Sequence, residues 1–157
     1  PNKVTLIFAE NSNENTGGFT SCYSNNHVNS INTIKASIVT TLGGIAAVEQ
    51  IFGINDTGNS HDLDCAFNKT KSLVIDNCFC GFALHPSDFD NSEELKAKQE
   101  QVIASEVEKY YRKAKEILAN NRAFLDKLAA ELIKKRLLTA LDIQSIKSTC
   151  KIISVSV

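Results

Sequence analysis

The stretch that decides the fold covers residues 30–53 and reads SINTIKASIVTTLGGIAAVEQIFG. Large apolar residues recur along it at the spacing of one helical face: Ile31, Ile34, Ile38, Leu42, Ile45 and Phe52. This period predicts an amphipathic helix that begins after Ser30 as N-cap and stops at Gly53. Gly43 and Gly44 each cost about 1 kcal/mol relative to alanine inside a helix. We therefore expect another segment to pack very close to the backbone at this glycine pair.

A second helix is predicted directly after this one, so that residues 30–75 hold two core helices. The turn Thr57-Gly58-Asn59-Ser60 ends in a residue suited to capping a helix. Apolar or small residues then follow at helical spacing: Leu63, Ala66, Phe67, Thr70 and Val74. This face is expected to pack in the core.

A β-hairpin is predicted upstream, within residues 1–23. Residues 3–8 and 19–23 are rich in β-branched and aromatic side chains, and a polar, turn-rich stretch at residues 10–18 separates them. Two such runs joined by turn residues are typical of a hairpin with a long loop.

Helices are also predicted within residues 91–147, after an irregular stretch at residues 76–91. The first opens at Asn91, which forms a capping-box-like pattern with Glu94. Its apolar face carries Ile103, Val107, Tyr110, Ala114 and Ile117. Asn120 and Asn121 break this helix, and a second one follows with an apolar face of its own. That second face carries Phe124, Leu125, Leu128 and Leu132.

These two faces are expected to pack against each other as a C-terminal helical pair, on the helix that holds Gly43 and Gly44. Thr139 and Asp142 open a last short helix. The predicted fold class is mainly α with a small β-hairpin, in a single domain that covers residues 1–157.

Composition narrows the classes of function. The chain has 157 residues, of which 43% are hydrophobic and 22% charged, and its net charge is −1. It lacks the basic surplus of a nucleic-acid-binding protein. Its apolar runs are only a few residues long, so we expect a membrane contact only through segments that are not present. The odd set of five cysteines favours a reducing compartment: Cys22, Cys65, Cys78, Cys80 and Cys150.

Two motifs resemble the FtsH family of zinc metallopeptidases. LGGIAAVEQIFG (residues 42–53) is similar to that family's Leu-Gly-Gly-Arg-x-Ala-Glu-Glu helix, which ends in Phe-Gly. TGNSHDL (residues 57–63) is similar to its Thr-Gly-Ala-x-Asn-Asp-Leu turn. KVTLI (3–7), GFT (18–20) and LLTALDI (137–143) match further family segments in the same order. The resemblance implies an FtsH-like peptidase domain over almost the whole chain.

The resemblance also implies a zinc ligand at Asp62. In the family, two His of a His-Glu-x-x-His helix and the Asp of the turn hold the catalytic zinc, and the Glu is the general base. That helix should lie just before Pro1, and His27, His61 and His85 form no such pair. We therefore expect the domain to lack its N-terminal zinc-motif helix, and this chain alone to bind no stoichiometric zinc and to be inactive.

By resemblance, the function is that of the proteolytic domain of an ATP-dependent zinc metalloendopeptidase that degrades unfolded or membrane polypeptides in protein quality control. The resemblance implies a homo-hexamer, and ATP bound only on a separate upstream module. It also implies a full protein anchored in a membrane, with this domain on the cytoplasmic side or in an organelle interior.

A protease-dead relative that acts as a scaffold or adaptor is the alternative. Ile45 stands where the family has Arg, Val48 where it has the first Glu of its Glu-Glu pair, and His61 where it has Asn. Glu49 matches the second Glu.

Local readings of the same residues stay open. Asp62 could serve only as a first-turn acid that favours the helix dipole. His61 and Cys65 could share a metal with Cys78 or Cys80, although Cys-x-Cys is a poor zinc spacing, and buried small hydrophobes are the alternative identity for these cysteines. No local signature marks a nucleophilic cysteine, and no phosphate-binding motif surrounds the glycine pair.

Overall fold

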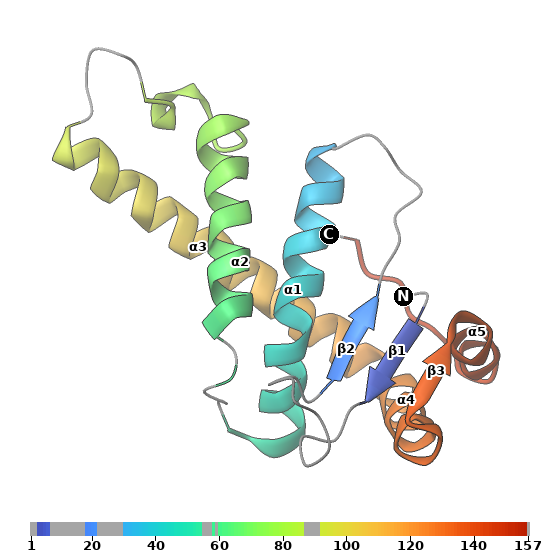
Figure 1. The fold of residues 1–157 in the computed structure, drawn as a ribbon. Helices are drawn as coiled ribbons and strands as arrows, with labels where there is room; N and C mark the ends of the chain where they lie inside the picture. The colour runs from blue at the N-terminus through green and yellow to red at the C-terminus, as the bar shows by residue number, and fades with distance from the viewer. Residues whose placement is uncertain are drawn as a thin grey trace. The chain divides into compact units, whose positions relative to one another are not determined.

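The computed structural model describes residues 3–6, 18–21, 30–54, 58, 60–86 and 92–156. The chain forms two compact units. The helical unit consists of residues 28–119 and 155–157, and the strand unit consists of residues 1–27 and 120–154. The predicted class, mainly α with a small β-hairpin, is confirmed (Figure 1). The assignment of residues 1–157 to one peptidase-like domain stays a prediction.

Helix α1 (Ile31–Phe52) has both predicted ends. The Ser30 hydroxyl accepts a hydrogen bond of 3.2 Å from the Thr33 amide, which satisfies one of the free N–H groups of the first turn. Gly53 adopts the left-handed conformation with φ 67° and donates its N–H to the Glu49 carbonyl at 2.9 Å. Glycine suits this position because it has no Cβ to clash there.

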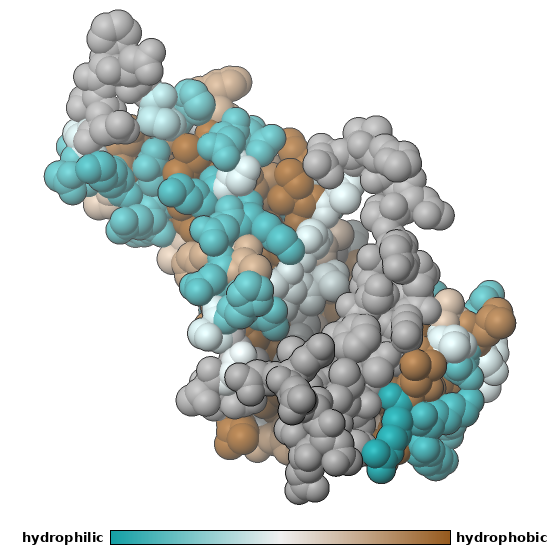
Figure 2. Space-filling view, in the orientation of Figure 1, coloured by the Kyte–Doolittle hydropathy of each residue, from teal (hydrophilic) through white to brown (hydrophobic). Residues whose placement is uncertain are grey.

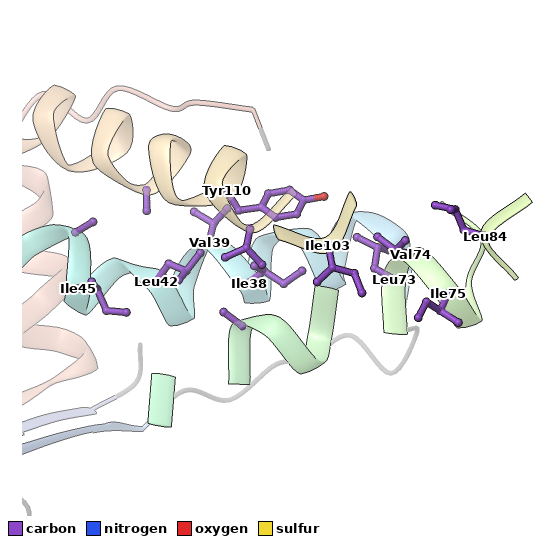
Figure 3. Packing of buried hydrophobic residues seen from close by; sticks show 14 residues of the cluster. Ile38, Val39, Leu42, Ile45, Leu73, Val74, Ile75, Leu84, Ile103 and Tyr110 are labelled. Atoms are coloured by element: carbon purple, nitrogen blue, oxygen red, sulfur yellow. The ribbon is translucent and has the colours of Figure 1, made fainter. Parts of the chain in front are cut away.

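The remaining elements of the helical unit are α2 (Ser60–Lys71), the π-helical turn η3 (Ser72–Asp76), the 3-10 turn η4 (Phe82–Leu84) and α3 (Glu93–Asn120). Side chains from all of these elements and from α1 meet in one core (Figure 3). Its buried members are Ile38, Val39, Leu42, Ile45, Ala46, Ala66, Leu73, Val74, Ile75, Leu84, Ile103, Val107, Tyr110 and Ala114.

The apolar face of α3 belongs to this core, together with side chains of α1, the helix that holds Gly43 and Gly44. Its packing on residues 124–132 stays a prediction. Ile103, Val107 and Tyr110 are buried with the α1 side chains, whereas helix α4 (Arg122–Lys135) has no buried residue. The predicted break lies at Asn121, between α3 and α4.

The Ser92 hydroxyl accepts a hydrogen bond of 3.2 Å from the Leu95 amide in the first turn of α3. The predicted start of this helix at Asn91 lies outside the described residues. One local expectation in the helical unit needs correction. On α2, Ala66 and Thr70 are buried, but Leu63 and Phe67 are about two-fifths exposed. Figure 2 shows hydrophobic patches among hydrophilic side chains on one face of this unit.

The strand unit contains a three-stranded antiparallel sheet in the order β2-β1-β3. Strand β1 (Lys3–Leu6) pairs with β2 (Gly18–Ser21) as the predicted hairpin. On its other edge it pairs with β3 (Leu137–Thr139), which places Val4 opposite the buried Leu138. The sequence analysis did not predict β3, because three residues show no period of their own and the strand is defined by its pairing with a distant segment.

Helix α5 (Ala140–Ser148) completes this unit. Its start is a capping box: the Thr139 hydroxyl accepts from the Asp142 amide, and the Asp142 carboxylate accepts from the Thr139 amide at 2.9 Å. The Asn121 amide side chain exchanges two hydrogen bonds with the Ile153 backbone, of 3.0 and 2.9 Å, and so fixes the segment after α5 beside the start of α4.

Helix α1 is also long and apolar enough to cross a membrane, by length and composition alone. The sequence analysis excluded such a segment because it counted only uninterrupted apolar runs. Small Ala, Gly, Ser and Thr residues interrupt those runs at little cost in hydropathy, and Lys35 and Glu49 are the only charged residues of the helix. In this structure one face of α1 lies in the core of the helical unit.

Candidate functional site

Asp62 is the third residue of α2 and lies on the side of that helix that faces α1. Its side chain is half-buried. A Cβ added to Gly44 of α1 would lie 3.9 Å from the Asp62 Oδ2 atom, so the carboxylate lies beside the backbone of Gly44. Helices α1 and α2 pack side by side along this contact (Figure 1).

The Asp62 carboxylate has no hydrogen bond or ion pair among the described residues. It is therefore not used for holding α2 to another element, and both oxygens can accept a ligand. A carboxylate needs such an available oxygen to bind a metal ion.

Among the described residues, none makes the close packing that we expected at the glycine pair. A Cβ at Gly43 would have no atom of the described residues within 4 Å, and a Cβ at Gly44 would make an ordinary contact with Asp62 alone. Among the described residues, no segment closes on this part of α1.

A polar seam joins α1 and α2 beside Asp62, and the sequence analysis missed it. The Lys69 ammonium donates to the Ser37 hydroxyl at 2.9 Å and to the Thr41 hydroxyl at 2.8 Å. Ser37, Thr41 and Gly44 follow each other at spacings of four and three on α1, and Asp62 and Lys69 lie seven residues apart on α2. Each set lies on one helical face. The seam holds the face of α2 that carries Asp62 against α1.

Glu49, the residue that matches the second Glu of the family's pair, ties α1 to α3. Its carboxylate accepts from the Lys115 ammonium at 2.9 Å and from the Tyr111 hydroxyl. These bonds, the Lys115 bond first, lower the pKa of Glu49. Burial, and then the bond to Glu49, raises the pKa of Tyr111 to about 12. Gln50 adds a bond of 2.7 Å to the Lys115 carbonyl oxygen. Glu49 thus has a structural role in this chain.

Among the described residues, His61 and Cys65 do not come together with Cys78 or Cys80 as the shared metal site that we considered. His61 Nε2 lies 3.6 Å from Cys65 Sγ on α2, but the Cys78 thiol donates to the Ile75 carbonyl oxygen at 3.6 Å. The His85 ring lies 3.0 Å from that same oxygen. In the described part of the chain, no three His, Cys, Asp or Glu residues are placed to share a metal ion. His27 and Cys22 lie outside the described residues.

Two surface grooves lie elsewhere. One, of about 520 Å³, is in the strand unit and is lined by residues of α4 and α5 such as Lys127 and Asp142. The other, of about 490 Å³, is in the helical unit between α2 and the first turns of α3, beside Phe67 and Ile103. Asp62 lines neither groove.

No protein-family model matches the chain. The chain is 27% identical over 132 residues to the ATP-dependent zinc metalloprotease FtsH 3 of Synechocystis sp. (strain ATCC 27184 / PCC 6803 / Kazusa). The match covers 72% of the chain and 21% of that protein, so the chain spans about a fifth of the length of this curated relative. The similarity agrees with the family that the two motifs indicated and points to an FtsH-related protein.

Proposed function

We propose that this chain is the second half of the peptidase domain of an FtsH-type, ATP-dependent zinc metalloendopeptidase, in which Asp62 is the third protein ligand of the catalytic zinc. The observation that carries the proposal is the position of Asp62. Its carboxylate is half-buried, has no partner among the described residues and lies beside Gly44, in a glycine pair on which no described residue packs closely.

The residues present fit one corner of a zinc site. A catalytic zinc takes three protein ligands, commonly two His and one carboxylate, and keeps a fourth position open. Asp62 would supply the carboxylate, and a preceding His-Glu-x-x-His helix on the open face at Gly43 and Gly44 would supply the imidazoles. When bound, zinc would polarise the scissile carbonyl and make water nucleophilic at neutral pH. Lys69 would keep Asp62 oriented through its bonds to Ser37 and Thr41.

The wider activity follows from the same proposal. The FtsH relative is named as ATP-dependent and as a zinc metalloprotease. We infer that the whole protein hydrolyses unfolded or membrane-extracted polypeptides, works as a hexamer, and binds ATP on a module upstream of this chain. Its membrane anchor would also lie upstream, with this domain on the cytoplasmic side or in an organelle interior.

The Asp62→Asn variant of the intact protein tests the ligand role. Asparagine keeps the size of the side chain and removes its charge, so zinc affinity should fall by about 10–100-fold or more and proteolysis of casein should be lost. The melting temperature should change little, because a first-turn acid contributes at most about 1 kcal/mol at an exposed site. Zinc affinity, casein hydrolysis and melting temperature would be measured on the same preparation.

Asp64→Asn is the matched control. Asp64 lies two residues further along α2, is exposed, and has no described partner. This variant should keep zinc and activity. If Asp62→Asn behaves like Asp64→Asn, Asp62 is only a first-turn acid and the ligand role is wrong.

The protease-dead scaffold is the second candidate, and the substitutions at Ile45, Val48 and His61 favour it. The coding sequence upstream of Pro1 separates the two functions: a His-Glu-x-x-His helix before Lys3 supports the peptidase. For the present chain alone we expect no zinc after dialysis against a chelator, because one carboxylate does not replace three ligands. Elemental analysis of the dialysed chain checks this expectation.

A further inference from the structure

His61 and Cys65 form a pair of potential metal ligands on α2, in addition to the Asp62 carboxylate. They stand four residues apart, which places both side chains on one face of the helix. The His61 Nε2 atom lies 3.6 Å from the Cys65 Sγ atom. His61 is exposed and Cys65 half-buried, so the pair can be reached from solvent.

The separation of these two atoms has the size that a shared metal requires. Zinc binds a thiolate sulfur at about 2.3 Å and an imidazole nitrogen at about 2.0–2.1 Å, and in tetrahedral geometry these two ligands are about 3.6 Å apart. The Nε2 and Sγ atoms are therefore as far apart as two ligands of one ion. Thiolate and imidazole together select soft or borderline cations over Mg²⁺ and Ca²⁺.

We propose that His61 and Cys65 chelate one thiophilic divalent cation, Zn²⁺ or Cd²⁺, on the first two turns of α2. Neutral His61 would give its Nε2 lone pair to the metal. The Cys65 thiol would release its proton to solvent as the sulfur–metal bond forms. In the described part of the chain, no third His, Cys, Asp or Glu completes the set, so water fills the remaining positions. Binding is reversible and is removed by dialysis against a chelator.

The proposal does not depend on the catalytic zinc. The pair lies within one helix and needs no upstream segment, whereas the proposed zinc site requires two imidazoles from outside this chain. A thiol–imidazole hydrogen bond would give the same 3.6 Å contact, so the experiment has to separate metal binding from that bond.

Cadmium titration of the full 157-residue chain, under reducing conditions, makes that separation. Cys22, Cys78, Cys80 and Cys150 are first replaced with serine, so that the sulfur-to-cadmium charge-transfer absorption reports on Cys65 alone. We expect one Cd²⁺ per chain. His61→Gln should weaken its binding by about tenfold or more, since a removed direct ligand costs at least as much as an outer one.

Two further variants are the matched controls. His85→Gln removes an imidazole that contacts the Ile75 carbonyl oxygen and no described thiol, and should leave cadmium affinity unchanged. Asp62→Asn should also leave it unchanged. Equal cadmium affinity in His61→Gln and in the parent chain would mean that Cys65 binds the ion without His61, and would overturn the proposal. A loss in Asp62→Asn equal to that in His61→Gln would assign the ion to the Asp62 site instead, and an absence of cadmium binding would also overturn it.

A second measurement covers the case in which the serine background does not fold. In the otherwise native chain, Zn²⁺ should shift the ring resonances of His61, and Cys65→Ser should abolish the shift. Serine keeps a hydroxyl that can still bond to the imidazole but is a poor ligand for these ions. A shift that survives in Cys65→Ser would contradict chelation by the pair.

Discussion

Helices α2 and α5 each carry an aspartate as their third residue, but the two carboxylates differ in their hydrogen-bond partners. Asp142 is the third residue of α5 and accepts from the Thr139 amide at 2.9 Å, from the Thr139 hydroxyl at 2.6 Å and from the Lys135 ammonium at 2.7 Å. Asp62 is the third residue of α2 and has no partner among the described residues.

The comparison separates a carboxylate that stabilises the fold from one that is free to bind a ligand. Both aspartates suit the positive end of a helix dipole, so their position alone does not distinguish them. The bonds to Lys135 and Thr139 hold the pKa of Asp142 well below its usual range. The neighbours of Asp62 are instead a glycine without a side chain and an open face of α1.

The largest effect is expected when the open face beside Asp62 is filled. In the chain by itself, Gly43→Ala and Gly44→Ala should each stabilise the helical unit by about 1 kcal/mol, because alanine restricts the unfolded chain and meets no described atom closer than 3.9 Å. In the intact protein the same double variant should lower zinc affinity and proteolysis, because the added methyl groups occupy the face proposed for the zinc helix. Denaturant unfolding checks the predicted gain in stability, and casein hydrolysis checks the predicted loss of activity.

The proteolytic activity of the double variant of the intact protein tests the proposal that a zinc helix packs on this face. Full activity in the double alanine variant would mean that no segment packs on this face. A destabilised isolated chain would mean that a described neighbour lies closer to α1 than the structure places it.

The start of α5 gives the next effect. Thr139→Ala removes the N-cap and should cost about 1 kcal/mol. Asp142→Asn should also lower the melting temperature, whereas Asp62→Asn should leave it almost unchanged. Thermal unfolding of the three variants at one pH compares the two helix starts directly, and equal melting temperatures for the two Asn variants would remove the distinction between the aspartates.

The lowered pKa of Asp142 predicts that its contribution to stability depends on pH. Because the folded-state pKa of Asp142 is lowered, the unfolded chain takes up a proton first as the pH falls. The stabilisation from Asp142 is therefore complete above its ordinary pKa of about 4 and is lost as the pH falls through the folded-state value. The difference in melting temperature between the native chain and Asp142→Asn should shrink below about pH 4. A constant difference down to strong acid would contradict the role of the charge.

The last effect is expected at the polar seam. Lys69→Met keeps the apolar stem and removes the two bonds to Ser37 and Thr41. The Thr41 hydroxyl keeps its bond to the Ser37 carbonyl oxygen, so the loss should be about 1 kcal/mol. In the intact protein we expect a larger fall in zinc affinity than in stability, because Asp62 loses its orientation. Lys71→Met, two residues further and exposed, is the control.

Sequence patterns predicted the elements of the fold better than their contacts. The apolar period of residues 30–53, the Ser30 cap, the Gly53 stop and the break at Asn121 all appear where they were expected. The α3 face is buried with side chains of α1, the helix on which it was expected to pack, whereas its packing on α4 stays a prediction, because several apolar faces were available and no periodicity tells which of them meet. Strand β3 was missed because its backbone bonds come from β1, at the other end of the sequence.

The candidate sites also differ in how much of them the sequence predicted. Sequence alone determined that His61 and Cys65 would meet, since an α-helix places residues four apart on one face whatever surrounds it. It also placed Asp62 in the first turn of a helix and, through the family motifs, marked it as a candidate ligand. Only the tertiary structure decided that Asp62 is free and Asp142 is not. The bonds between Asp142 and Thr139 follow from the local spacing of a capping box. The contacts of Asp142 with Lys135 and of Asp62 with Gly44 are instead made by the packing of other elements, which no local spacing encodes.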